Sequence, residues 1–359
     1  MSDEVVVERL VRLTSIRSLS RDESAIAEAV TAELASAGLR VERSGCNLWC
    51  EIGDAPRPRL LLNSHLDTVP PGEGWSADPW TPRRGNGRVT ALGANDAKGC
   101  VSALMQAALR LAEALKRGER LGGTVVLALT AEEETSGAGL GTILDRIGPI
   151  DAALVGEPTG LTPMTAQRGL LILRLRARGR TGHPAHEPPE RAANAIHLAA
   201  EDVAALRVFD WGPAHPLLGK CHAHVTQIHG GVARNVIPDA CECFVDVRTT
   251  PLQPHGPTVE RLRASLRSEV HVHSERLIPV ETPAGERIVR AVLAALPGSS
   301  PTGSPSMSDM VFLSGTPAVK IGPGRPERSH TADEFITETE LREGAAAYER
   351  IAREYFKAE

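Results

Sequence analysis

The chain has 359 residues, of which 42% are hydrophobic and 24% charged, and its formal net charge at pH 7 is −5. This length suggests about two domains, on the usual prior of roughly 150 residues each. The composition is that of an ordinary globular protein with neither a polybasic stretch nor an acidic tail, so we expect no nucleic-acid partner.

The beginning of the chain, MSDEVVVERLVRL, does not resemble a secretion signal. It carries acidic residues where such a signal needs positive charge, and its apolar residues are interrupted too often to span a bilayer. We therefore expect a cytoplasmic protein without a membrane partner. We also expect the six cysteines to be free thiols, because disulfide frameworks belong to secreted chains and because the CxxC spacing of structural zinc sites is missing.

The first part of the chain alternates helix-like and strand-like segments. Some segments have the apolar spacing of helices, and others are short continuous apolar runs typical of strands buried on both faces. The helical segments are 5–16, 23–38 and 100–118, and the strands are 59–65, 124–130 and 151–158. This alternation predicts a layered α/β domain with a central mixed sheet.

From residue 168 the pattern changes. The stretch LLILRLRARGR alternates apolar and basic residues, which indicates a strand with one face in water. The segments that follow are, in order, a helix, two strands, a helix and a strand. Their ranges are 189–207, 222–231, 235–251, 257–270 and 270–280. This is the order of the ferredoxin-like α+β unit.

After this unit the chain returns to the style of the first part. A helix is expected at 285–296, a strand at 316–324 and a closing helix from Glu338 onward. The simplest architecture is a catalytic domain made of residues 1–167 and 282–359, interrupted by an inserted domain at 168–281.

Acidic residues and histidines follow nearly every predicted strand of the first domain. In open α/β sheets, active sites collect beyond the carboxyl ends of the strands. The residues found there are His65, Asp67, Asp96, Glu132, Glu133, Glu134, Glu157 and His330. Histidine with several carboxylates is the ligand set of a catalytic zinc or cobalt site, and the surplus of carboxylates indicates two ions.

Each of these residues also has an ordinary structural interpretation. A lone His65 is most often a core or surface histidine, three glutamates in a row usually begin a solvated helix, and Asp96 has the position of a helix cap. The joint arrangement favours metal binding, because clustered acids repel one another unless cations lie among them.

Seven segments, in this order, resemble the dinuclear zinc deacylases and exopeptidases that include acetylornithine deacetylase, succinyl-diaminopimelate desuccinylase, aminoacylase and glutamate carboxypeptidase. They are LLLNSHLDTVPPGEGWSADPW, GANDAKG, TAEEETSG, VGEPT, GRTGHPAH, GGVARNVIPD followed by DVR, and SHTADE. The resemblance covers nearly the whole chain.

The resemblance implies a ligand set for two zinc ions, with cobalt as a substitute. Asp96 would bridge the two ions. His65 and Glu157 would complete one site. Glu134 and His330 would complete the other.

The resemblance also implies roles for neighbouring residues. Asp67 would support His65 from behind, and Glu133 would be the general base. Because this chain reads TAEEET where the family usually has TADEET, a shift by one residue would make Glu132 the base instead. Lys98 matches the family pattern without an assigned role.

The inserted domain is expected to act as a lid and dimerisation domain. By resemblance, His183 would stabilise the oxyanion that develops during the reaction. Asn235 and Arg248 would hold the α-carboxylate of the substrate. The implied partners are a small N-acyl amino acid and a second copy of the chain.

Within the family, the segments DAKG, TAEEETS and SHTADE are most similar to acetylornithine deacetylases. The first expectation is therefore hydrolysis of N2-acetyl-L-ornithine to L-ornithine and acetate in arginine biosynthesis. Deacylases of acetylcitrulline, of acetyl-lysine-type compounds and of succinyl-diaminopimelate stay open, as do dipeptidases and carboxypeptidases. A non-catalytic binding protein is disfavoured because no expected ligand is missing, and a phosphate-binding enzyme because GxxxxGK[ST] does not occur.

Overall fold

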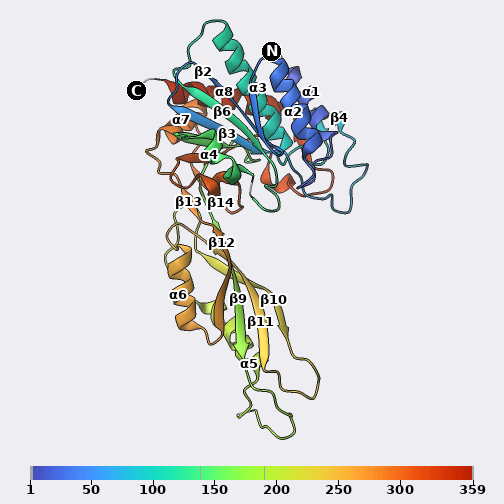
Figure 1. Cartoon of the computed structure of the whole chain (residues 1–359), viewed down its shortest axis with the longest axis vertical. Helices are drawn as coiled ribbons and strands as arrows, with labels where there is room; N and C mark the ends of the chain where they lie inside the picture. Colours follow the sequence, from blue (N-terminus) through green and yellow to red (C-terminus); the bar gives the residue numbers. More distant parts are fainter. Residues whose placement is uncertain (1–2, 138, 190, 358–359) are drawn as a thin grey trace. The chain divides into compact units, whose positions relative to one another are not determined.

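The computed structural model describes residues 3–137, 139–189 and 191–357. The chain divides into two compact units (Figure 1). Unit 1 contains the chain up to Thr165, Glu281–Thr302 and the chain from Ser308 onward, and unit 2 contains Ala166–Val280 and Gly303–Met307. The sequence placed residues 303–307 in the first domain, whereas their contacts assign them to unit 2.

The main sheet, most of which belongs to unit 1, is mixed and has the strand order β1-β2-β6-β3-β7-β15-β8-β13, and β14 pairs with β8. The strands are β1 (Val41–Ser44), β2 (Asn47–Gly53), β3 (Arg59–His65), β6 (Thr124–Thr130), β7 (Ala152–Val155), β8 (Met164–Gln167), β13 (Val280–Glu281), β14 (Thr302–Ser304) and β15 (Ala318–Lys320). Strands β6, β3, β7 and β15 are parallel, while β1, β2 and β8 pair antiparallel. The expected α/β class with a mixed sheet is confirmed, although the sequence missed β1 and β2.

Long helices cover one face of this sheet. They are α1 (Glu4–Thr14), α2 (Ser24–Ser36), α3 (Lys98–Lys116), α7 (Arg287–Ala295) and α8 (Glu338–Phe356). Their apolar residues form one core with alternate residues of β2, β3 and β6, which explains the helical spacing read from the sequence. The short helices η1 (Leu140–Thr142), α4 (Leu144–Ile147) and η2 (Asp309–Leu313) lie outside this core, and η2 packs against β7 and β15. Helix α8 begins where predicted, because Thr337 and Glu340 form a capping box.

A second, three-stranded sheet in unit 1 has the order β16-β5-β4. Its strands are β4 (Arg83–Gly85), β5 (Arg88–Thr90) and β16 (Phe335–Thr337). Asp96 follows β5, so the expectation that every candidate ligand follows a strand of one central sheet is wrong. The interpretation of Asp96 as a helix cap is wrong too, because the N-cap residue of α3 is Ala97.

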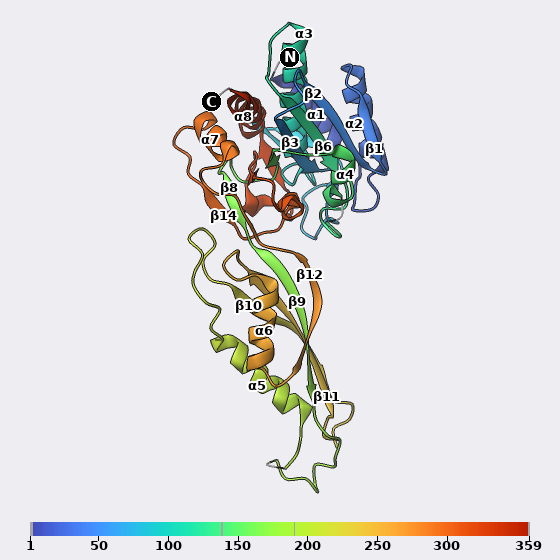
Figure 2. The same ribbon diagram turned by 60° about the vertical axis from the view of Figure 1, so that its left-hand side comes forward.

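Unit 2 has the predicted ferredoxin-like order of elements (Figure 2). The elements are β9 (Gly169–Arg178), α5 (Ala195–Val208), β10 (His222–Gly230), β11 (Ala240–Thr249), α6 (His255–Ser265) and β12 (Glu269–Leu277). The sheet is antiparallel with the order β10-β11-β9-β12, and both helices share a core with one of its faces. Helix α5 begins later than the expected residue 189, because Asn194 caps it by accepting the N–H of Ile196; position 190 lies outside the described residues.

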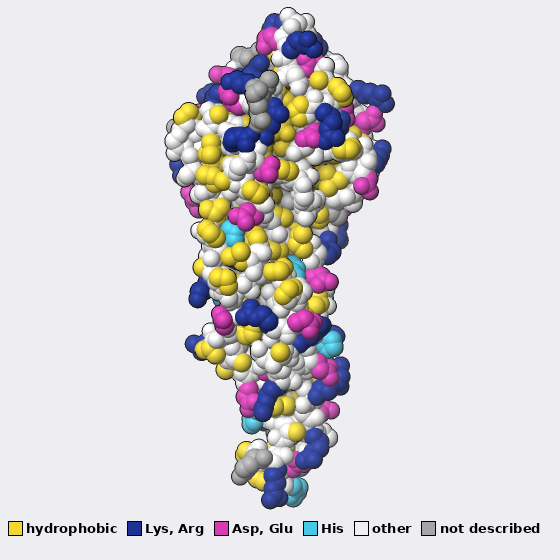
Figure 3. All heavy atoms as spheres, turned by 90° about the vertical axis from the view of Figure 1, so that its left-hand side faces the viewer, with side chains coloured by type: hydrophobic (Ala, Val, Ile, Leu, Met, Phe, Trp, Pro, Cys, Tyr) yellow, Lys and Arg dark blue, Asp and Glu magenta, His cyan; other side chains and the backbone are white. Residues whose placement is uncertain are grey.

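The distribution of surface charge and the state of the cysteines match what the sequence predicts. On the face drawn in Figure 3, Lys and Arg side chains are interspersed with Asp and Glu side chains. All six cysteines are free thiols, as expected. Within the three described stretches, no helix combines the length and the apolar character needed to cross a membrane.

Candidate metal centre

The five predicted metal ligands lie together in unit 1. Nε2 of His65 lies 3.3 Å from Oδ1 of Asp96 and 4.0 Å from Oε1 of Glu157. Nε2 of His330 lies 2.9 Å from Oε1 of Glu134 and 3.8 Å from Oδ2 of Asp96. The two oxygens of Asp96 therefore face different imidazoles, and its carboxylate lies between two half-sites.

The spacing of these atoms fits divalent cations. Zinc binds histidine nitrogen and carboxylate oxygen at about 2.0–2.2 Å, which at tetrahedral angles separates neighbouring ligand atoms by roughly 3.3 Å. The four histidine–carboxylate distances given above range from 2.9 to 4.0 Å, and the ligand atoms of His65, Asp96 and Glu134 all lie within 4.8 Å of one another. Imidazole and carboxylate are also ligand types that suit zinc. The residues present therefore fit a two-cation site.

Asp67 orients the first imidazole. Its side chain is fully buried, and its Oδ1 lies 3.3 Å from Nδ1 of His65, which also faces the Asp67 carbonyl oxygen at 3.0 Å. Because Nδ1 donates its proton to Asp67, Nε2 is directed toward Asp96. Burial lowers the pKa of His65, but Asp67, Asp96 and Glu157 outweigh burial and hold this pKa well above its ordinary value. A cation at Nε2 would take the place of the second ring proton.

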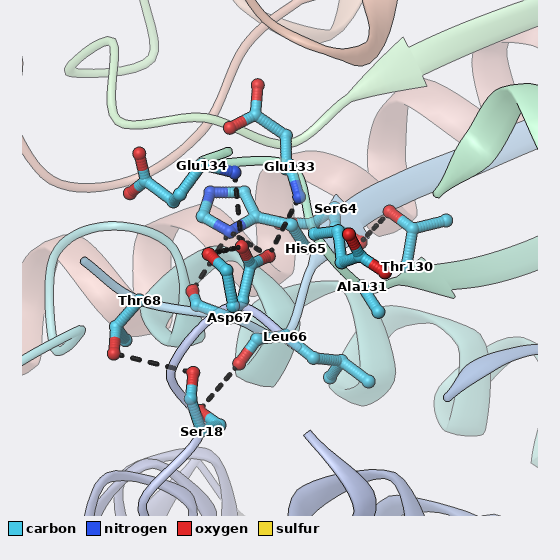
Figure 4. Close-up of polar contacts among 12 residues, drawn as sticks. Ser18, Ser64, His65, Leu66, Asp67, Thr68, Thr130, Ala131, Glu133 and Glu134 are labelled. Carbon is cyan, nitrogen blue, oxygen red and sulfur yellow. Dashed lines mark hydrogen bonds and ion pairs between the residues drawn. The ribbon is translucent and has the colours of Figure 1, made fainter. Parts of the chain in front are cut away.

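The same carboxylate holds the loop that follows β6. Oδ1 of Asp67 accepts the backbone N–H of Glu133 and Oδ2 accepts that of Glu134, both at 3.1 Å. Oδ2 also accepts the hydroxyl of Ser20 at 2.7 Å. Figure 4 shows both backbone nitrogens beside Asp67, with the two glutamate side chains extending away from it. Burial would raise the pKa of Asp67, but His65 and these donors lower it to about 2.

The structure distinguishes Glu132 from Glu133. Glu132 has a left-handed backbone with φ of 58°, its N–H binds Glu23, and its Oε2 lies 3.4 Å from Nε of Arg21. Its carboxylate is therefore occupied away from the cluster. Glu133 lies among the candidate ligands, where burial raises its pKa well above the ordinary value against the opposing effect of His65. The geometry favours Glu133 as the acid that faces the cluster.

The loop that carries Asp96 is held by a buried acid that sequence reasoning missed. Oε1 of Glu334 accepts the backbone N–H groups of Asn95 at 2.7 Å and Asp96 at 2.8 Å, and Oε2 accepts that of Gly93 at 3.1 Å. Burial raises the pKa of Glu334 to about 7. The available signal was its position in SHTADE, four residues after His330.

Lys98, to which the sequence analysis assigned no role, lies in the same region. Its side chain is fully buried at the start of α3, and its Nζ donates to the carbonyl oxygen of Ile16 at 2.8 Å. Burial lowers the pKa of Lys98 to about 7, although the charges of Glu334 and Asp67 act in the opposite direction. Lys98 is therefore a buried amine close to the two acids that hold the ligand loops.

The predicted ligands lie near two further buried groups, Lys320 and Asp309, that the sequence analysis did not single out. Burial raises the pKa of Glu157 to about 7, against the nearby charge of Lys320. Asp309 accepts the hydroxyl of Thr130 at 2.8 Å, and burial raises its pKa to about 6. These shifts share a cause, because carboxylates crowded in low dielectric take up protons when no cation neutralises them.

The three residues predicted in the inserted domain lie in unit 2. Arg248 on β11 makes a two-bond pair with Asp246, from Nε to Oδ1 at 2.8 Å and from Nη2 to Oδ2 at 3.1 Å. His183 and Asn235 are exposed on loops, and the ring of His183 lies 5.3 Å from that of His186. The five candidate ligands belong to unit 1 and these three residues to unit 2, so the roles of the three stay predictions.

Known sequences are similar to this chain over nearly its full length. The succinyl-diaminopimelate desuccinylase of Xylella fastidiosa (strain M23) is 32% identical over 372 residues, which covers 95% of this chain and 95% of the relative. The succinyl-diaminopimelate desuccinylase of Stenotrophomonas maltophilia (strain R551-3) is 29% identical over 377 residues and covers 96% and 98%.

Solved structures share the fold. Aminopeptidase PepT from Bacillus cereus ATCC 10987 matches with a TM-score of 0.83 at 20% identity, covering 99% of this chain and 100% of that one. The sequence model of peptidase family M20/M25/M40 matches residues 61–354, a range that contains all five candidate ligands. The resemblance drawn from the seven segments is thereby confirmed. The chain belongs to peptidase family M20/M25/M40, and it is a metal-dependent hydrolase of amide bonds.

Proposed function

We propose that the protein hydrolyses the amide bond of an N-succinyl amino acid, with N-succinyl-diaminopimelate as the leading substrate. The observation that carries the reaction type is the position of Asp96, whose two oxygens face His65 and His330. Two cations held in this way suit the hydrolysis of a linear amide. The acyl group is proposed from the desuccinylases that are 32% identical over nearly the whole chain.

This proposal changes the substrate expected from the sequence. The segments DAKG, TAEEETS and SHTADE favoured N2-acetyl-L-ornithine. Similarity over 95% of the chain weighs more than three short segments, because the metal-binding segments serve the reaction that the whole family shares. N-acetylornithine is the second candidate and enters the test as a competing substrate.

The proposed ligands divide the centre into two halves that share Asp96. His65 and Glu157 would hold one zinc ion, and Glu134 and His330 the other. When bound, the pair of ions supplies a water of lowered pKa and polarises the carbonyl of the amide. Proton transfer and substrate binding are carried out by side chains of the protein.

Glu133 accepts the proton of the attacking water and returns it to the departing amine. Its raised pKa suits an acid that must both take and release a proton near neutrality, although bound cations would lower this pKa again. Asp67 keeps Glu133 in place, because it binds the backbone N–H of Glu133 while it orients His65.

Residues of unit 2 would bind the substrate. We carry over from the family resemblance that His183 donates to the oxyanion and that Asn235 and Arg248 bind the α-carboxylate. The pairing of Arg248 with Asp246 holds the guanidinium in one orientation before substrate binds. A substrate carboxylate would share this guanidinium with Asp246 or displace it.

We also propose that two copies of the chain associate through unit 2. Strand β10 lies at an edge of its sheet and leaves its outer backbone groups for pairing. Ile228 is 51% exposed and Val232 is 89% exposed, and Ile196 of α5 packs close to Gly230 at the end of β10. An edge strand beside exposed apolar side chains suits an isologous contact between identical chains.

The test of the substrate is a direct comparison. Zinc-loaded protein is given N-succinyl-diaminopimelate, N-acetylornithine, N-acetylcitrulline and several dipeptides, and kcat/KM is measured from amine release. We expect the succinyl compound to be preferred by about 10²-fold or more. The polar groups of the site that bind the distal carboxylate of the succinyl group would have no partner when an acetyl group is bound. A preference for N-acetylornithine would change the proposed acyl group from succinyl to acetyl. Hydrolysis of none of these amides would overturn the proposal.

A further inference from the structure

We propose that Glu334 is a positioning residue of the metal centre. It holds the backbone on which Asp96 stands, and through Asp96 it sets the affinity of both cation sites together. This inference rests on the proposed two-cation function. It concerns a residue that neither binds a cation nor touches the substrate in that proposal.

Glu334 holds the short loop between β5 and α3 by hydrogen bonds to its backbone, and we call this arrangement the clamp. Its side chain is 2% exposed, and its two oxygens accept three backbone N–H groups, those of Gly93, Asn95 and Asp96. Its own carbonyl oxygen accepts the N–H of Ala91 at 3.1 Å. These four residues lie between β5 and α3, outside any strand or helix, so Glu334 replaces the partners that regular structure would supply.

The loop is also fixed on its other side. Nδ2 of Asn95 donates to the carbonyl oxygen of Arg325 at 3.0 Å, and Oδ1 of Asn95 accepts the N–H of Arg325 at 2.9 Å. Gly93 has φ of 76°, and a Cβ there would lie 2.6 Å from Thr68 and 3.3 Å from Lys98. The backbone therefore has little freedom to shift, provided that the carboxylate of Glu334 stays in place.

The position of Asp96 links this clamp to both cations. The side chain of Asp96 is short, so the backbone of residues 95 and 96 determines where its two oxygens lie. One oxygen faces His65 and the other faces His330. A displacement of this backbone would weaken both half-sites, whereas loss of Glu157 or Glu134 would weaken mainly its own half.

The test is a metal titration of full-length Glu334→Gln. The amide has nearly the same shape, but it places an N–H₂ group against a backbone N–H and keeps only one acceptor. Cobalt and zinc affinities are measured by chelator competition, and the visible spectrum of bound cobalt reports the geometry of its ligands. We expect both affinities to fall about 10–100-fold, as is typical for loss of a group behind the ligands, and the cobalt spectrum to change. Glu334→Asp, which keeps both acceptors, should recover part of the affinity.

Asp202→Asn is the matched control. Asp202 is 3% exposed in unit 2, and its oxygens accept the backbone N–H groups of Arg267 at 2.9 Å and Ser268 at 2.8 Å. This variant should lose stability without a change in metal affinity or cobalt spectrum. If Asp202→Asn shifts metal affinity as much as Glu334→Gln does, the effect of Glu334 is one of general stability, and the inference is overturned.

The outcomes separate this inference from the proposed function. Wild-type affinities in folded Glu334→Gln would overturn the positioning role and leave the two-cation site intact. Wild-type protein that binds fewer than two cations would instead overturn the proposed function. If Glu334→Gln does not fold, Glu334→Asp decides, and unchanged affinities in that variant contradict the inference.

Discussion

Glu134 and His330 are 196 positions apart in the sequence, yet Oε1 of the glutamate lies 2.9 Å from Nε2 of the histidine. The hydrogen bond and the charge of Glu134 raise the pKa of His330 to about 9, although partial burial acts against them. A cation at this position needs the same ring nitrogen in its neutral form, so protons and cations compete for it.

This competition predicts a pH dependence of metal binding. His330 is protonated in the metal-free protein below its pKa of about 9, and the pKa of His65 is also raised. Zinc affinity should therefore rise as the pH increases toward 9. Titration calorimetry at pH 7, repeated in buffers of different ionisation enthalpy, should show release of more than one proton per chain. Binding without proton release would contradict the description of the cluster.

Whereas metal affinity should rise with pH, the folding stability of the metal-free protein should fall. The pKa of His330 is raised from 6.5 to about 9 on folding, so its pair with Glu134 stabilises the fold fully below pH 6.5 and is lost as the pH rises through 9. The melting temperature of metal-free protein should fall over this interval for this reason. The effect is small, because the imidazole is half exposed.

The assignment of the general base predicts a difference between neighbouring glutamates. Glu133→Gln should keep both cations and lower kcat by about 10²–10⁴-fold, because the proton acceptor is lost while the ligands remain. Glu132→Gln is the matched control and should keep most of the activity, since Glu132 pairs with Arg21. Elemental analysis and steady-state kinetics measure both effects. Greater loss in the Glu132 variant would move the base to that residue.

Close packing behind Glu157 predicts the effect of a single added methyl group. A Cβ at Gly322 would lie 2.5 Å from the carbonyl oxygen of Glu157, 2.6 Å from the hydroxyl of Tyr348 and 2.7 Å from Sγ of Cys100. Gly322→Ala should therefore lower the free energy of unfolding by about 1–3 kcal/mol, measured by urea denaturation. Gly256→Ala in α6 is the control, because a Cβ there meets no atom within 4 Å. It should leave stability unchanged or raise it by up to about 1 kcal/mol, and equal effects of both variants would contradict the packing argument.

The proposed contact between two copies predicts the effect of a charge on β10. Ile228→Lys should convert a dimer into a monomer, measured by light scattering during size-exclusion chromatography, because the ammonium group would have to be buried in the contact. Leu252→Lys is the control, since Leu252 is similarly exposed, at 46% against 51%, but lies outside the edge strand. A monomeric wild-type protein, or a Leu252 variant that dissociates equally, would refute this contact.

The sequence predicts well those features that depend on local patterns. The continuous apolar run of 124–130 is buried at every residue, and the capping box at Thr337 marks the start of α8. His65 and Asp67 were associated correctly because both stand at the end of one strand, where their spacing alone brings them together.

The features that were missed depend on contacts between distant segments. Glu334 binds backbone groups 238 to 241 residues earlier in the chain, and no local spacing indicates such a contact. Asp96 was placed after a strand of the main sheet, but residues 88–90 form a short strand of a separate sheet. The different surroundings of Glu132 and Glu133 depend on contacts with Arg21 and Asp67, which only the folded chain brings to that loop.

In the proposed centre Asp96 joins two cation sites, and anomalous diffraction from crystals of the zinc-loaded protein would locate both cations. We expect two anomalous peaks per chain about 3.5–4 Å apart, with one oxygen of Asp96 bound to each. A single peak, or two peaks that Asp96 does not touch, would contradict the proposed centre.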